Sequence, residues 1–206
     1  MHWMPRHLVL VKHSLPAIDR DRPPSRWTLS PEGRLRAAAL ADHLARFTPA
    51  VLYASPEPKT IETATIAAER LGVAVEPVAG LEEHARDTEP ITTPEDFRMR
   101  AKRLFEEPDR VVFGAESATA ARRRFTRALM GVVAGRPAGD LVVVSHGTVI
   151  TLFVSAAAGV EPYAFWNRLG LPSYVVLALP GLEVARVQWQ VETEGAPPAH
   201  LRGSVK

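Results

Sequence analysis

The chain contains short, continuous runs of apolar residues that favour strands. The two clearest runs, at 8–11 and 141–144, consist only of leucine and valine. Runs without alternating polar positions are typical of strands buried on both faces, as in a parallel sheet. Two late runs are joined by a Pro180-Gly181 turn and are expected to pair antiparallel. Strands are therefore predicted at 8–11, 51–54, 73–78, 141–144, 174–179 and 184–191.

Helical patterns fill most of the segments between these strands. Serine or threonine followed by proline is a common helix start, and such pairs begin at Ser30, Ser55 and Thr93. A long helix is predicted at 117–133, where apolar residues recur at helical spacing, and a mostly apolar helix at 148–157. Strands alternating with helices indicate an α/β fold. We expect a three-layer sandwich with a mostly parallel central sheet and helices on both faces.

The domain organisation follows from length and local composition. A chain of 206 residues suits a single domain over 1–206. A long loop is predicted at 14–29, and a helical insertion or lid at about 85–115. Closely spaced glycine and proline residues predict a loosely held tail at about 192–206.

Composition excludes several classes of function. The 25 basic and 23 acidic residues give a formal net charge of +2, which does not favour nucleic acid, and the arginines at 122–124 fit a solvated helix face. The absence of cysteine excludes disulfides, thiol nucleophiles and thiolate metal sites. The apolar run at 8–11 is too short for a signal-peptide core or a membrane span. We therefore expect a cytoplasmic protein that binds neither nucleic acid nor membrane.

Two histidines and a lysine are expected to meet at one edge of the sheet. His13 follows the strand at 8–11, and His146 follows the strand at 141–144. Lys59 lies near the start of the helix after the second strand. In open α/β sheets, ligands bind beyond the carboxyl ends of the strands. The pattern alone therefore predicts a site that contains all three residues.

The residue types at this edge suit a phosphate or a phosphate ester. Lys12 and Lys59 supply positive charge, and helix starts at Ser55 and Gly147 add backbone N–H groups. A neutral imidazole is a competent nucleophile at phosphorus near pH 7. A carboxylic acid must then protonate the leaving oxygen, and the loop after the third strand can supply one. Its candidates are Glu82, Glu83 and Asp87.

The ordered motifs resemble those of the histidine phosphatase superfamily, also called the phosphoglycerate-mutase-like fold. The family's Arg-His-Gly reads Lys12-His13-Ser14 here, and its Ser-His-Gly is present as Ser145-His146-Gly147. Its Ser-Pro-x-x-Arg motif resembles the segment 55–59, and its Leu-x-Glu motif resembles 81–83. Further similar segments lie at 29–33 and 115–117.

The resemblance implies a phosphatase that needs no metal or other cofactor and acts on a small phosphorylated substrate. His13 would accept the phosphoryl group, and Glu83 would serve as general acid and then general base. The phosphoryl oxygens would be held by His146, Lys12, Lys59, Ser14 and Gly147. Lysine replaces arginine at positions 12 and 59, which keeps the charge but loses the bidentate fork. Ser14 replaces a glycine, which narrows the approach to the phosphate.

Three other functions stay open. The two lysine replacements motivate a phosphate-ester-binding protein with little or no turnover. A phosphoglycerate-mutase-type phosphotransferase is the second alternative. The third is a metal hydrolase that uses His13, His84, His146 and Asp87, although their spacing matches no common metal motif.

The substrate and the oligomeric state are not fixed by the sequence. The loop at 14–29, called the first loop, and the loop at 81–90, called the acid loop, carry several basic or aromatic residues. These residues either line the mouth of the site, favouring anionic or aromatic substrates, or form a solvated basic surface. They are Arg20, Arg22, Arg26, Trp27 and Arg86. Phe165 and Trp166 fit either a homodimer interface or the core.

Overall fold

The computed structural model describes residues 6–89, 93–135 and 139–193, and its centre is a six-stranded sheet. The strand order is β3-β2-β4-β1-β5-β6. The first four strands of this order run parallel to one another, whereas β5 is antiparallel to both β1 and β6. The strands are β1 (Arg6–Lys12), β2 (Val51–Ala54), β3 (Ala74–Pro77), β4 (Leu141–Ser145), β5 (Ser173–Leu179) and β6 (Glu183–Gln188).

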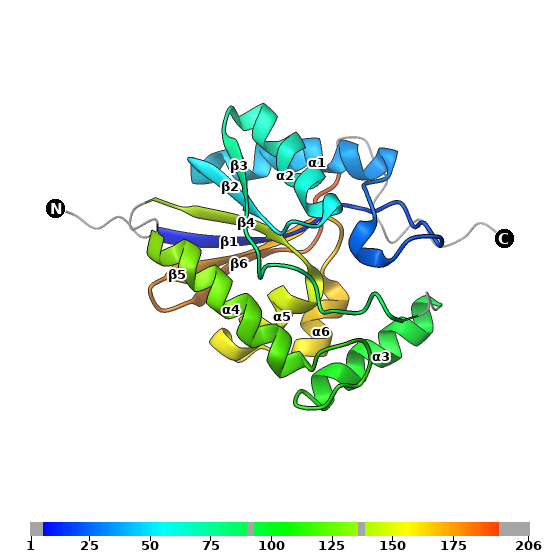
Figure 1. The fold of residues 1–206 in the computed structure, drawn as a ribbon. Coiled ribbons are helices and arrows are strands. Elements are labelled where there is room, and N and C mark those ends of the chain that lie inside the picture. Colours follow the sequence, from blue (N-terminus) through cyan, green and yellow to red (C-terminus); the bar gives the residue numbers. More distant parts are fainter. Residues whose placement is uncertain (1–5, 90–92, 136–138, 194–206) are drawn as a thin grey trace.

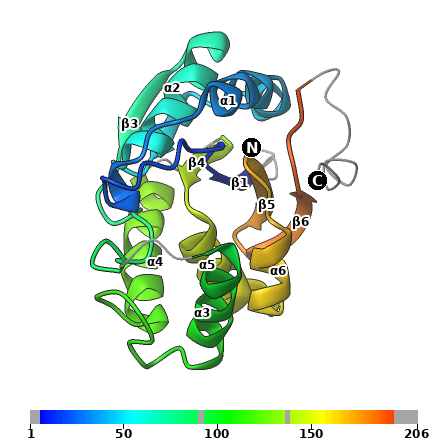
Figure 2. The same ribbon diagram turned by 90° about the vertical axis from the view of Figure 1, so that its right-hand side faces the viewer.

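Helices cover both faces of the sheet, which confirms the predicted three-layer α/β sandwich. One face carries α1 (Pro31–Leu44) and α2 (Pro58–Leu71), as Figures 1 and 2 show. The opposite face carries α3 (Pro94–Glu106), α4 (Ala118–Gly135), α5 (Gly147–Ala158) and α6 (Pro162–Arg168). Two short 3₁₀ helices, η1 (Pro24–Arg26) and η2 (Ala45–Phe47), complete the described elements.

The central strands are apolar on both faces because each face has its own core. Leu8 and Leu10 of β1 belong to the cluster packed under α4 and α5. Val9 and Val11 belong to the cluster under α1 and α2. All four side chains are fully buried. Since successive side chains of a strand point to opposite faces, an uninterrupted apolar run is what a covered central strand requires.

Several boundaries differ from the predicted ones. Helix α2 begins at Pro58 and not at Ser55, because the Ser55 N–H continues the strand pairing by donating to the Val144 carbonyl. Strand β6 ends at Gln188, and beyond it the Val191 N–H donates to the Pro172 carbonyl. The predicted loop at 14–29 contains η1 and an isolated bridge between its two ends.

Helix α6 was not predicted from the sequence. The Glu161 carboxylate caps it by accepting the N–H groups of Tyr163 and Ala164, and Pro162 occupies the first turn. Phe165 is buried, and the Trp166 ring packs 5.6 Å from that of Phe97 in α3. These two aromatic residues therefore belong to the packing between α6 and its neighbours.

The expected helix within 85–115 is α3, and its role as a lid stays a prediction. Most of the expected tail, 194–206, lies outside the described residues. Among the described helices, none is long and apolar enough to cross a membrane.

Candidate active site

The two histidines lie side by side because their strands are neighbours. In the sheet, β4 runs between β2 and β1. The His13 N–H donates to the Ser145 carbonyl at 2.9 Å, immediately before His146. The two imidazole rings meet edge to face, with their centroids 5.2 Å apart. The structure thus brings together the two histidines at the edge predicted from the sequence.

His13 has a defined tautomer. Its Nδ1 lies 2.7 Å from the main-chain oxygen of Ser14. Because a carbonyl oxygen only accepts, Nδ1 must carry the hydrogen, and the neutral ring keeps its lone pair on Nε2. Burial holds the pKa of His13 well below its ordinary value, and the positive charge of Lys59 lowers the pKa further. The hydrogen bond to Ser14 raises the pKa, whereas the charges of Lys12 and Arg86 lower it. His13 is therefore a neutral imidazole with a free Nε2.

Ser14 directs both its hydrogen-bond donors to other protein groups. Its hydroxyl donates to the Gly33 carbonyl at 2.7 Å, and its main-chain N–H donates to Oγ1 of Thr63 at 3.0 Å. A Cβ on Gly33 would lie 2.0 Å from the Leu15 oxygen, so glycine is needed for this close approach. Both donors of Ser14, which was expected to bind phosphate, are used within the protein.

His146 is fixed at one nitrogen and open at the other. Its Nε2 lies 2.9 Å from the Ser55 hydroxyl and 3.3 Å from Oε1 of Glu57. Its Nδ1 is buried and has no hydrogen-bond partner among the described residues. Burial, followed by the charge of Lys59 and by His13, holds the pKa of His146 well below its ordinary value.

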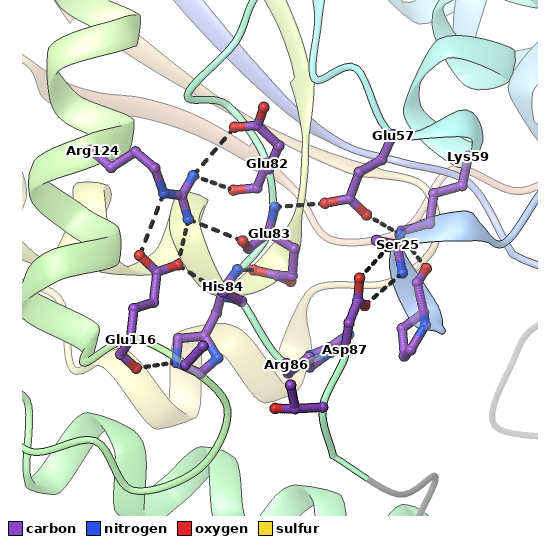
Figure 3. A pocket seen from close by; sticks show the side chains of 14 residues that line it. Ser25, Glu57, Lys59, Glu82, Glu83, His84, Arg86, Asp87, Glu116 and Arg124 are labelled. Atoms are coloured by element: carbon purple, nitrogen blue, oxygen red, sulfur yellow. Dashed lines mark hydrogen bonds and ion pairs between the residues drawn. The ribbon is translucent and has the colours of Figure 1, made fainter. Parts of the chain in front are cut away.

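Glu57 is a member of the site that the sequence interpretation missed. Its carboxylate pairs with the Lys59 ammonium and accepts the Glu83 N–H at 2.9 Å (Figure 3). It also lies beside Nε2 of His146. Burial raises the pKa of Glu57 and lowers that of Lys59, while their mutual attraction opposes both shifts. The only sequence signal was an acidic residue two positions before Lys59 at a helix start.

The two lysines approach the site from different elements. Lys59, in the first turn of α2, donates to the Pro24 carbonyl at 2.8 Å as well as to Glu57. Lys12, at the end of β1, donates to the Leu169 carbonyl at 2.8 Å. Burial lowers the pKa of Lys12 to about 8, with Glu83 opposing this shift and Arg86 adding to it. A Cβ on Gly147 would lie 3.0 Å from Cε of Lys12, so glycine leaves room for the lysine chain.

Glu83 is held as a carboxylate at the start of α5. Its Oε2 accepts the Thr148 N–H at 3.3 Å, and its Oε1 accepts the His84 N–H at 2.9 Å. Burial alone would raise its pKa, but the charge of Arg86 and these two N–H groups outweigh burial and leave the pKa below its ordinary value.

Arg124 of α4 fixes the loop that carries Glu83. Its guanidinium donates to the Gly80 carbonyl. It also donates to the carbonyls of Glu82 and Glu83 and to the carboxylate of Glu116, as Figure 3 shows. The expectation of a solvated helix face is therefore wrong for Arg124, because the arginine side chain reaches across to this loop.

The other two candidate acids are engaged elsewhere. Glu82 accepts the Gly80 N–H at 2.7 Å and pairs with Arg124. Asp87 accepts the N–H and the hydroxyl of Ser25, which ties the first loop to the acid loop (Figure 3).

Comparison with known proteins establishes the family. Residues 8–192 match the model of the histidine phosphatase superfamily (branch 1). The chain belongs to the histidine phosphatase superfamily. A comparison with curated protein sequences gave no match.

Solved structures of this superfamily share the fold. A mycobacterial glucosyl-3-phosphoglycerate phosphatase in complex with inorganic phosphate is 23% identical, with a TM-score of 0.70, covering 91% of this chain and 98% of that chain. A phosphoserine phosphatase mutant from Entamoeba histolytica, in complex with phosphoserine, is 17% identical, with a TM-score of 0.70 and coverages of 89% and 96%. The Bacillus stearothermophilus protein YhfR is 18% identical, with a TM-score of 0.70 and coverages of 94% and 98%. At these identities the likeness shows the fold.

In this member of the superfamily, the acid loop borders an open cavity of about 410 Å³. Glu57, Lys59, Glu83 and Arg86 line it, together with the Ser25–Asp87 contact (Figure 3). His13 is 7% exposed and His146 is fully buried, and neither is among the residues that line this cavity.

The residues of the metal-hydrolase alternative do not form one cluster. Nε2 of His84 lies 2.7 Å from the Glu116 carbonyl, and Asp87 binds Ser25. Within 6–89, 93–135 and 139–193, the structure contains no group of three or more histidine, aspartate or glutamate residues placed to hold a metal ion.

Proposed function

We propose that this histidine phosphatase superfamily member is a phosphomonoesterase that passes the phosphoryl group through Nε2 of His13 to water without a metal ion. The observation that carries the proposal is the 2.7 Å contact between His13 Nδ1 and the Ser14 carbonyl, which leaves the Nε2 lone pair free. Burial and two lysines keep this ring neutral and therefore nucleophilic.

In the first step, Nε2 of His13 attacks phosphorus and the bond between phosphorus and the alcohol oxygen breaks. Glu83, in its protonated form, gives its proton to the departing oxygen. Glu83 is ionised at rest, since its pKa lies below the ordinary value. A phosphate dianion beside it disfavours the carboxylate charge, so proton uptake by Glu83 accompanies substrate binding.

In the second step, the Glu83 carboxylate takes a proton from water as that water attacks phosphorus. The bond between phosphorus and Nε2 breaks, inorganic phosphate leaves, and His13 returns to its neutral form. One water is consumed, and one alcohol and one phosphate are released.

The remaining groups stabilise charge on the phosphoryl oxygens. His146 offers its unpartnered Nδ1, and Gly147 begins helix α5, whose N-terminal end favours anions. Lys12 and Lys59 each retain donor capacity beyond their bonds to carbonyls and, for Lys59, to Glu57. Ser14 has no role as a phosphate ligand here, because both its donors are used by Gly33 and Thr63.

One observation favours a phosphate-ester-binding protein without turnover. The Lys59 ammonium, which stands where the family motif has arginine, is committed to the Glu57 carboxylate and the Pro24 carbonyl. A lysine held in this way stabilises a transferring phosphoryl group less than a bidentate arginine does.

Hydrolysis of p-nitrophenyl phosphate distinguishes the two functions. We expect activity that persists in a chelator and disappears in His13→Ala. His43→Ala is the matched control, because His43 lies on α1 and contacts Tyr174 outside the site. Saturable phosphate binding without turnover would instead support the binding protein.

A further inference from the structure

A second cavity, of about 420 Å³, lies next to the cavity of about 410 Å³ at the acid loop. Pro24 and Arg86 line both cavities, so these two residues lie at the boundary between them. The cavity at the acid loop is bordered mainly by charged and polar residues. The second cavity is mostly apolar, and its wall includes Ile18, Trp27, Phe97, Phe113 and Leu171.

Three aromatic rings, those of Trp27, Phe97 and Phe113, form an aromatic wall that contacts within the protein hold in place. The Trp27 indole N–H lies 2.8 Å from the Asp19 carbonyl, which anchors the ring within the first loop. The Phe97 ring on α3 packs against Phe113 and Trp166, with centroids 6.4 Å and 5.6 Å away. Rings fixed in this way lose little freedom when they bind another apolar group.

Arg86 connects the wall to the catalytic residues. Its guanidinium carbon lies 4.6 Å from the centroid of the Phe97 ring. Its charge also acts on the pKa values of Lys12, His13 and Glu83. Arg86 therefore lies near the residues of the phosphoryl site and also against the Phe97 ring of the second cavity.

Two of the charged residues that line the second cavity, Glu89 and Arg100, form an ion pair with each other. Arg100 pairs with Glu89 at 2.7 Å, and Glu89 also accepts the Gly114 N–H. In contrast, Ile18 at the rim is 67% exposed, which leaves apolar surface for a ligand to cover.

We infer that this cavity binds the leaving group of the substrate and that this leaving group carries an aromatic ring. The substrate class is thus an aryl or arylalkyl phosphomonoester, with the phosphoryl group at His13 and the ring between the first loop and Phe97. The inference rests on the proposed phosphoryl site.

Phosphonates test ring recognition without requiring turnover. Calorimetry on the full chain would compare benzylphosphonate with methylphosphonate. Burial of the ring predicts about 10-fold or more tighter binding of benzylphosphonate. Equal affinities, or no binding of either compound, would overturn the inference.

Three variants locate the ring. Phe97→Ala should reduce the preference for benzylphosphonate by about 5-fold or more, and Ile18→Ser by about 2-fold, because each removes apolar wall. Met99→Ala is the matched control, since Met99 lies on the same helix, is 64% exposed and is not among the lining residues. An unchanged preference in Phe97→Ala and Ile18→Ser would overturn the placement.

Turnover of benzyl phosphate and ethyl phosphate separates this inference from the proposed function. Both release primary alcohols, and we expect a higher kcat/KM for the benzyl ester. His13-dependent turnover with equal kcat/KM would overturn the aromatic assignment and leave the hydrolase intact. A clear phosphonate preference without any turnover would support the aromatic cavity and contradict the phosphomonoesterase.

Discussion

The carboxylate of Glu57 lies 3.3 Å from Nε2 of His146 and forms a buried ion pair with Lys59. The side chains of Glu57 and Lys59 are only 9% and 3% exposed. One carboxylate thus links a histidine, a lysine and, through the Glu83 N–H, the acid loop. We infer that Glu57 is a positioning residue for all three.

Loss of Glu57 should destabilise the fold. Glu57→Gln leaves the Lys59 ammonium buried without a counterion, which predicts a loss of about 3 kcal/mol in the free energy of unfolding, measured in urea. Glu62→Gln, on the helix that Glu57 precedes, is the matched control, because its partner Arg34 is exposed and such a pair contributes about 0–1 kcal/mol. Equal losses in the two variants would contradict the buried-pair interpretation.

Lys12 should set the basic limb of the pH profile. Its positive charge is lost as the pH rises through its pKa of about 8, so kcat/KM should fall there. His13, whose pKa is held well below its ordinary value, stays neutral across this range and does not contribute to the limb. Lys12→Arg keeps its charge beyond pH 12 and should move the limb upward. A limb that stays near pH 8 in Lys12→Arg would assign it to another group.

The role of Glu83 as an acid should depend on the leaving group. Glu83→Gln is expected to lower turnover of benzyl phosphate by about 100-fold or more, because an alkoxide needs a proton to leave. p-Nitrophenolate leaves without being protonated, so Glu83→Gln should slow the first step far less with p-nitrophenyl phosphate.

Glu82→Gln is the matched control for Glu83→Gln. Glu82 is adjacent in the chain, but its carboxylate binds the Gly80 N–H and Arg124. If Glu83→Gln slows the phosphorylation of His13 equally with both esters, measured before steady state, Glu83 does not protonate the leaving group.

Arg124 should support catalysis through the position of Glu83. Arg124→Met removes the donors to the carbonyls of Gly80, Glu82 and Glu83. Displacement of the acid predicts a fall in kcat of about 10–100-fold for benzyl phosphate, with a smaller change in KM. Arg123→Met, an exposed neighbour on α4, should have no such effect. A purely structural role would lower the activity toward benzyl and p-nitrophenyl phosphate in equal proportion.

The sheet edge and its histidines were predictable because they depend on local pattern. Uninterrupted apolar runs mark β1 and β4, and the residues that follow parallel neighbouring strands must lie together. Strand positions alone therefore predict that His13 and His146 lie side by side, as they do in the structure.

The surroundings of the histidines depend on contacts that no local pattern records. Glu57 reaches Glu83, which is 26 positions away in the chain, and Arg124 reaches the Gly80 carbonyl, 44 positions away. The sequence predicts a solvated position for an arginine within a run of three, because the loop that this arginine contacts is distant in the chain. The aromatic wall likewise joins Trp27 of the first loop to Phe97 of α3, two segments that no spacing rule connects.

The central claim is that His13 carries the phosphoryl group during turnover. The most direct measurement is rapid quenching under alkaline conditions, which preserve phosphohistidine, followed by peptide mass spectrometry. We expect phosphate on His13 during turnover of benzyl phosphate in the presence of a chelator, and no phosphorylated peptide from the His13→Ala protein. Turnover without phosphate on His13, or with phosphate on His146 instead, would contradict the role of His13 as the nucleophile.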